Sequence, residues 1–204
     1  MDLKGRYILY IKMLSLEEIA QKYEAVDNNY GSDKNTSHCY IDTYTRLFEG
    51  RREQTLNILE IGIFSGASLQ IWSEYFPSSN IVGCDIDLGP VKFGQTNPSI
   101  KMFLSDATTE EGCQIVKQNG PYDIIIDDGA HTQEAILASI NLLASSLRDK
   151  DSQYVIEDID LNRFPNILEE IRETSSQNGL SCEIIDLRSI KNRFDDVMAV
   201  LQKV

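Results

Sequence analysis

The chain has 204 residues and a formal net charge of −13, with 42% hydrophobic and 25% charged residues. This composition suits one globular domain with a small N-terminal extension, and the acidic field disfavours nucleic-acid partners because the longest basic run is only Arg51-Arg52. No apolar run approaches the ~20 residues of a membrane span, and no cleavage pattern marks the short apolar stretch 6–14 as a signal peptide. The four cysteines are scattered and form no C-x-x-C pair, which fits a reducing compartment, so we predict a cytoplasmic protein without membrane contact.

Residues 1–54 are predicted to form a helical N-terminal cap. Ser15 with Glu18 three residues later is typical of a capping box, which predicts a helix from 15 to about 26. Apolar residues recur at helical spacing over 40–48 and predict a second helix.

Residues 55–204 alternate between strand and helix patterns and are predicted to form the main domain. The expected strands are 56–61, 80–85, 100–104, 122–127, 154–157, 182–187 and 197–201, and the expected helices are 67–76, 108–119, 132–147 and 165–178. This alternation predicts an α/β fold with a doubly wound, mostly parallel, seven-stranded sheet and helices on both faces. The polar run 189–196 shows no convincing helix, so the last strand is expected to be antiparallel.

A glycine-containing loop follows the first predicted strand. It runs from Glu60 through Gly62, Ser65 and Gly66 into a helix, so backbone N–H groups at the helix start could hold a nucleoside-type cofactor with a carboxylate. It departs from the G-x-G-x-x-G fingerprint, and an ordinary glycine turn is the alternative.

Acidic residues end the next two strands. Asp85 follows the glycine loop by about twenty residues, a spacing at which a carboxylate binds ribose hydroxyls, whereas Asp87 is expected to form only the turn. Asp106 could accept a hydrogen bond from an adenine amino group. Alternatively, Asp106 or Thr108 caps the following helix.

Two further strands end in pairs of acids, Asp127-Asp128 and Glu157-Asp158. Parallel strands end at one edge of the sheet, and carboxylates there could hold Mg²⁺ or Mn²⁺. His131 follows Asp128 at the start of a helix, where the helix dipole favours the neutral imidazole that a general base requires. The alternatives are that these acids only form turns and caps, and that His131 is a water-exposed surface residue.

The other histidine, His38, either lines the site or merely precedes a helix, and the second reading is preferred. Trp72 recurs with apolar residues at helical spacing and is expected in the core.

These motifs together resemble class I S-adenosylmethionine (SAM)-dependent methyltransferases. The D-D-G-x-H and I-E-D strand ends, with the upstream segment G-S-D-K at 31–34, are similar to metal-dependent O-methyltransferases related to macrolide-sugar methyltransferases. The resemblance covers roughly residues 28–160 in scattered motifs.

The resemblance implies a role for each matched residue. The SAM loop would be shaped by Glu60, Gly62, Ser65 and Gly66, with Asp85 holding the ribose and Asp106 the adenine. Mg²⁺ would be bound by Asp128 and Asp158, with Glu157 as a further candidate ligand. His131 would take the proton of the substrate hydroxyl. The large N-terminal domain of the macrolide methyltransferases has no counterpart in this chain, so their substrate class does not transfer directly.

The predicted function is therefore SAM- and Mg²⁺-dependent O-methylation of a small-molecule or sugar hydroxyl, with the oligomeric state open to a homo-oligomer. Two alternatives are retained. A nucleotide-dependent oxidoreductase on a similar sheet is disfavoured by the missing glycine fingerprint, and a non-catalytic SAM- or nucleotide-binding module is disfavoured by the intact set of acids and His131.

Overall fold

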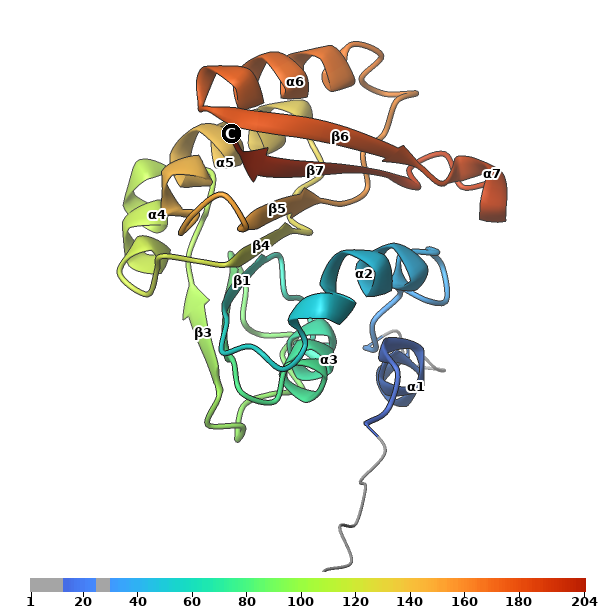
Figure 1. The fold of residues 1–204 in the computed structure, drawn as a ribbon, viewed down its shortest axis with the longest axis vertical. Helices are drawn as coiled ribbons and strands as arrows, with labels where there is room; N and C mark the ends of the chain where they lie inside the picture. The colour runs from blue at the N-terminus through green and yellow to red at the C-terminus, as the bar shows by residue number, and fades with distance from the viewer. Residues whose placement is uncertain (1–12, 25–29) are drawn as a thin grey trace, which may run out of the picture.

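The structure is a computed structural model that describes residues 13–24 and 30–204 (Figure 1). Most of the stretch 6–14 and the end of the first predicted helix therefore lie outside the described residues. Within them, the capping box is present: Ser15 accepts a hydrogen bond from the N–H of Glu18, whose carboxylate accepts one from the N–H of Ser15.

Seven strands form one sheet, which confirms the predicted number of strands, and their order is β3-β2-β1-β4-β5-β7-β6. Every neighbouring pair is parallel except those of β7, which runs antiparallel to both β5 and β6. The strands are β1 (Asn57–Ile61), β2 (Asn80–Asp85), β3 (Ile100–Leu104), β4 (Ile124–Asp127), β5 (Gln153–Ile156), β6 (Leu180–Asp186) and β7 (Val197–Lys203).

The helices cover both faces of this sheet, with α1, α2 and α3 on one side and α4, α5 and α6 on the other (Figure 1). They are α1 (Leu16–Ala20), α2 (Ile41–Phe48), α3 (Ala67–Tyr75), α4 (Glu110–Lys117), α5 (Gln133–Leu143), α6 (Ile167–Gln177) and α7 (Arg188–Lys191). Single 3₁₀ turns follow three of them, at Gln21–Tyr23, Glu49–Arg51 and Ala144–Ser146. The polar run 189–196, expected to lack a helix, contains the end of the one-turn α7.

Two hydrophobic cores lie against the two faces because successive strand residues point to opposite sides. In β4, Ile124 and Ile126 join the core under α3, whereas Ile125 joins the core under α5. All three are fully buried, as the continuous β-branched run predicts for a central parallel strand.

The N-terminal segment shares the first of these cores rather than lying outside it. Tyr44 and Phe48 of α2 are fully buried against Trp72 of α3, with ring centroids 5.0 and 6.1 Å away. The expectation that Trp72 belongs to the core is confirmed. The boundary between residues 54 and 55 stays a prediction.

The chain reverses direction across the sheet between β1 and β4. From β1 it proceeds outward through β2 and β3, then returns to place β4 on the other side of β1. Loops at the carboxyl ends of these two central strands diverge, and such a switch point is where open α/β sheets bind ligands. None of the described helices is long and apolar enough to cross a bilayer.

Candidate cofactor and metal site

A cavity of about 820 Å³ opens at the carboxyl ends of the central strands. Its walls come from the loops after β1, β2, β3 and β4 and from the segment 31–34. Gly62, Ser65, Asp85, Asp106, Asp128, His131 and Asp158 all line it, so the structure brings together most residues that the sequence predicts for one site.

The loop after β1 needs its glycines for steric reasons. Gly62 has φ +78°, and a Cβ there would lie 2.0 Å from the backbone oxygen of Asp128. Gly66 has φ +80° at the start of α3, and its Cβ would lie 2.7 Å from the backbone oxygen of Phe93. The contact at Gly62 thus packs the glycine loop directly against the loop after β4, which carries Asp128, the predicted metal ligand.

Glu60 lies at the end of β1 and is fully buried. Burial raises its pKa to about 7, and the nearby Lys34 ammonium, 3.5 Å from Glu60 Oε1, opposes that rise. Glu60 is not among the residues that line the cavity, and its predicted part in shaping the cofactor loop stays a prediction.

Asp85 holds the cofactor loop in place. Its Oδ2 accepts hydrogen bonds of 2.9 Å from the N–H groups of both Ile63 and Phe64, while Oδ1 accepts from the N–H of Asp87. Carboxylate oxygens can accept further bonds, so these contacts leave room for ribose hydroxyls in the cavity. Asp87 accepts from the N–H of Gly89, which is the turn-forming role expected of it.

Asp106 lines the cavity at the end of β3, and its Oδ1 accepts from the N–H and hydroxyl of Thr108. The helix cap is Thr109, whose hydroxyl accepts from the N–H of Gly112. The alternative that Asp106 or Thr108 caps α4 is therefore wrong.

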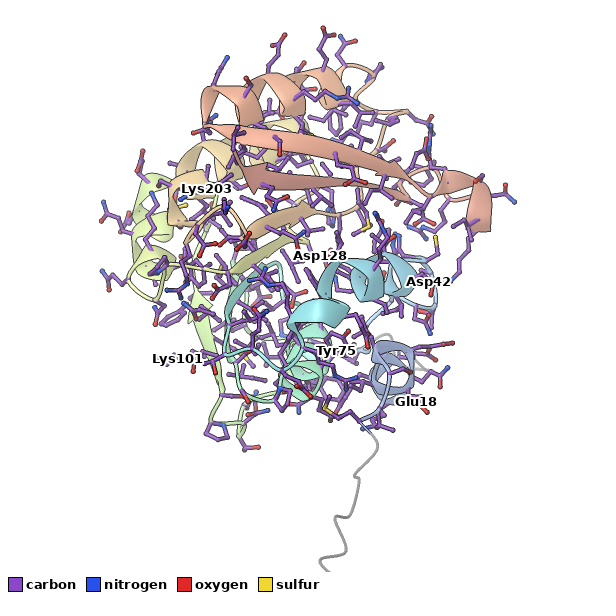
Figure 2. All side chains as sticks on the ribbon, in the orientation of Figure 1. Glu18, Asp42, Tyr75, Lys101, Asp128 and Lys203 are labelled. Carbon is purple, nitrogen blue, oxygen red and sulfur yellow. The ribbon has the colours of Figure 1, made fainter. Side chains whose placement is uncertain are left out.

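Asp128, His131 and Asp158 converge on the other side of the cavity. His131 Nε2 lies 3.7 Å from Asp128 Oδ1 and 3.8 Å from Asp158 Oδ2, and one ligand atom from each residue lies within 4.8 Å of the others. Two carboxylate oxygens at this spacing fit a hard divalent cation such as Mg²⁺. Asp128 lies near the middle of the molecule, between the strands and α2 (Figure 2).

The second oxygen of each carboxylate is anchored by buried groups. Asp128 Oδ2 accepts from Lys34 Nζ at 2.7 Å, and Asp158 Oδ1 accepts from the Tyr40 hydroxyl and lies 3.3 Å from His38 Nδ1. Burial raises the pKa of the Tyr40 phenol, which stays a neutral donor. Each acid is thus fixed through one oxygen and presents the other to His131.

Glu157 is more enclosed than its neighbour. One of its oxygens accepts from the Tyr44 hydroxyl and the other from Lys34 Nζ at 2.6 Å. Burial raises its pKa well above the usual range, and the Lys34 ammonium acts in the opposite direction. As a metal ligand it would have to share an oxygen that already accepts a hydrogen bond, and its predicted metal role stays a prediction.

Asp127, the first acid of its pair, has a different environment. It is buried beneath the cavity, where it accepts from the hydroxyls of Ser139 and Tyr154. The two acids of this pair therefore have separate roles, and only Asp128 reaches the cavity.

Sequence reasoning missed the residues that support the acids. Lys34, Tyr40 and Tyr44 come from the N-terminal segment and donate hydrogen bonds to Asp128, Asp158 and Glu157 respectively, more than 90 residues away in sequence. His38 was expected merely to precede a helix, which is wrong: its ring is buried between Asp158 and Asp196, with Nδ1 2.6 Å from Asp196 Oδ1. The G-S-D-K segment at 31–34 was the one available signal.

The chain is similar in sequence to several methyltransferases, although no protein-family profile matches it. The chain is 31% identical over 161 residues to L-olivosyl-oleandolide 3-O-methyltransferase of Streptomyces antibioticus, covering 74% of this chain and 38% of that protein. It is 32% identical over 131 residues to demethylmacrocin O-methyltransferase of Streptomyces fradiae, covering 60% of this chain and 32% of that protein. The chain thus spans less than two fifths of these curated relatives.

Solved structures agree with the sequence comparison. MycE methyltransferase from the mycinamycin pathway, solved with Mg and SAH, superposes with a TM-score of 0.70 at 25% identity, over 94% of this chain and 55% of that one. A putative caffeoyl-CoA O-methyltransferase from Staphylococcus aureus gives a TM-score of 0.61 at 14% identity, covering 93% and 90% of the two chains. The predicted fold and the predicted resemblance are both confirmed.

Proposed function

We propose that this chain transfers a methyl group from SAM to a hydroxyl while a divalent cation is bound. The premise is that the chain has the Rossmann-like methyltransferase fold and resembles macrolide-sugar O-methyltransferases in sequence. The observation that carries the proposal is the arrangement of Asp128, His131 and Asp158. They lie on the wall of the same cavity as the glycine loop and Asp85. One pocket thus joins a cofactor cradle, a pair of hard oxygen ligands and a base.

The cofactor cradle is assigned to the first three strand ends. The loop 60–66 would hold the methionine part of SAM at the start of α3, Asp85 the ribose, and Asp106 the adenine. Asp128 and Asp158 would hold the cation, with Glu157 as a third candidate ligand. When bound, SAM supplies an activated methyl group, and Mg²⁺ stabilises the anionic form of the acceptor oxygen.

His131 is the proposed general base. Its Nε2 faces the two free carboxylate oxygens, so an acceptor hydroxyl placed beside them would be within reach of the ring. Proton removal at Nε2 would make the acceptor oxygen a stronger nucleophile.

The proposed acceptor is a hydroxyl of a sugar or a sugar-bearing small molecule. The relatives named above act on oleandolide and macrocin derivatives, and the acidic chain disfavours polyanionic acceptors. Cytoplasmic location and a homo-oligomeric state stay predictions.

Calorimetric titration of SAH, with and without Mg²⁺, tests the cofactor part of the proposal. We expect SAH binding in the wild type and weakening by about 1–3 kcal/mol in D85A, because the ribose hydroxyls lose a charged acceptor. D87A is the matched control, since Asp87 only forms a turn, and it should bind SAH normally. Equal affinity in D85A and wild type would remove Asp85 from the site.

Turnover separates the proposal from its two alternatives. A screen of glycoside and catechol-like acceptors with SAM should show methyl transfer that EDTA abolishes and Mg²⁺ restores. Tight SAH binding without transfer to any acceptor would favour the non-catalytic module. Binding of a dinucleotide in preference to SAH would favour the oxidoreductase.

A further inference from the structure

The side chain of Lys34 reaches the centre of the carboxylate cluster and is almost completely buried there. Its Nζ lies 2.6 Å from Glu157 Oε2, 2.7 Å from Asp128 Oδ2 and 3.5 Å from Glu60 Oε1. These three acids end the neighbouring strands β5, β4 and β1, so a single ammonium from the N-terminal segment faces three strands of the sheet.

Such a cluster would be costly without a cation at its centre. Ionised carboxylates that share a buried site repel one another, and removing one partner of a buried ion pair is strongly destabilising because it leaves an uncompensated charge. The Tyr44 hydroxyl also binds Glu157, but it is neutral and cannot balance the charge. Lys34 is therefore the positive charge that Asp128 and Glu157 both contact directly.

Lys34 leaves the proposed cation position open. It contacts Asp128 through Oδ2, whereas the oxygen near His131 is Oδ1. The ammonium and a divalent cation could thus bind the same carboxylate from opposite sides.

We propose that Lys34 is a positioning residue, a permanent internal cation that balances the charge of Asp128 and Glu157 and holds both side chains in place before any metal binds. This inference rests on the proposed function for its metal, but the charge-balancing role is a property of the chain itself. It predicts that a variant without the Lys34 ammonium is less stable than the wild type. Removing one carboxylate charge, or adding a divalent cation, should restore part of that stability.

The test is a double-mutant cycle of K34M and E157Q, measured as thermal midpoints in EDTA. Methionine keeps most of the apolar stem of lysine, so K34M removes mainly the charge. We expect K34M to lower Tm by about 10 °C and E157Q to restore at least half of that loss in the double variant. Adding Mg²⁺ should raise the Tm of K34M by at least about 5 °C more than that of wild type.

Lys22 and Glu74 provide the matched control. Their side chains form a surface ion pair of 2.7 Å with exposures of 42% and 30%, so K22M and K22M/E74Q should change Tm little and should respond to Mg²⁺ as the wild type does. K34R should retain most of the wild-type Tm because it keeps the charge.

The outcomes are decisive in either direction. A double variant no more stable than K34M, including the case in which neither folds, would show that Lys34 acts through packing and would overturn the proposal. An equal Mg²⁺ response in K34M and wild type would overturn the metal part. The Tm measurements in EDTA require neither SAM nor metal. They therefore test the charge-balancing role of Lys34 even if SAH binding and turnover fail in the wild type.

Discussion

Left-handed backbone at non-glycine residues is concentrated at the proposed site. Of the four such residues in the described part of the chain, Phe64 (φ 42°), His131 (φ 49°) and Asp158 (φ 54°) all line the cavity. This conformation costs of order 1–3 kcal/mol per residue and persists only where the surroundings impose it. In Asp158 it accompanies a side chain whose Oδ1 contacts Tyr40 and His38 and whose Oδ2 lies 3.8 Å from His131 Nε2.

At the residue scale, the first prediction concerns His131. H131A should lower kcat by about 10²–10⁴-fold while SAH binding stays unchanged, because the ring takes a proton but does not hold the cofactor. The acid limb of the pH–rate profile, which reports protonation of the base, should disappear. Wild-type turnover with the same acid limb in H131A would make this residue structural.

The second prediction concerns the pH dependence of stability. Burial raises the pKa of Glu60 from 4.5 to about 7, so the folded protein binds a proton there that the unfolded chain releases. The resulting stability is fully present below about pH 4.5 and is lost as the pH rises through about 7. It amounts to about 3 kcal/mol.

The Glu60 effect is isolated by comparing E60Q with wild type in urea unfolding between pH 4.5 and 8. The free energy of unfolding of wild type should fall with pH relative to that of E60Q, because glutamine does not titrate. Parallel curves for the two proteins would show that Glu60 has an ordinary pKa.

At the element scale, the connection between β1 and α3 allows a sharp test. G62A should lose SAH binding and much of its folded yield, because the added Cβ would lie 2.0 Å from the backbone oxygen of Asp128 at a φ of +78°. G50A is the control, since among the described residues no atom beyond its own segment of the chain lies within 4 Å of the added Cβ. Normal SAH affinity in G62A would mean that the loop can shift without cost.

The elements themselves were largely predictable from hydrophobic periodicity. The run Ile124–Ile126 is buried on both faces, and its apolar character alone predicts a central strand. Helix ends were less accurate: the helix predicted for 132–147 ends at Leu143 and continues as a 3₁₀ turn, and a single turn is too short for the two periods to be told apart in the sequence. The position of β7 between β5 and β6 depends on tertiary packing, which local patterns do not encode.

Part of the site could also be predicted from the sequence, because it depends on where the strands end. Acids at the ends of parallel strands meet at one edge, so Asp85, Asp106, Asp128 and Asp158 could be placed together from the strand pattern. Lys34 and His38 could not, because their partners lie 94 to 158 residues further along the chain. The sequence therefore predicts the acids better than the groups that anchor them.

At the scale of the whole molecule, the N-terminal segment and the sheet should form one folding unit. A chain starting at residue 55 would lose Lys34 from the acid cluster and would expose Trp72, which packs on Tyr44 and Phe48. We expect this fragment to bind the dye ANS and to show no cooperative thermal transition. A fragment with a sharp transition and normal SAH affinity would instead make residues 1–54 a separable cap.

The place of β7 has a consequence for synthesis of the protein. The ribosome produces β6 before β7, yet β7 lies between β5 and β6 and pairs with both. At about 5–20 residues per second, β6 waits on the order of one to a few seconds for the strand that joins it to the sheet. During that interval β5 has an unpaired edge, which another nascent chain could occupy.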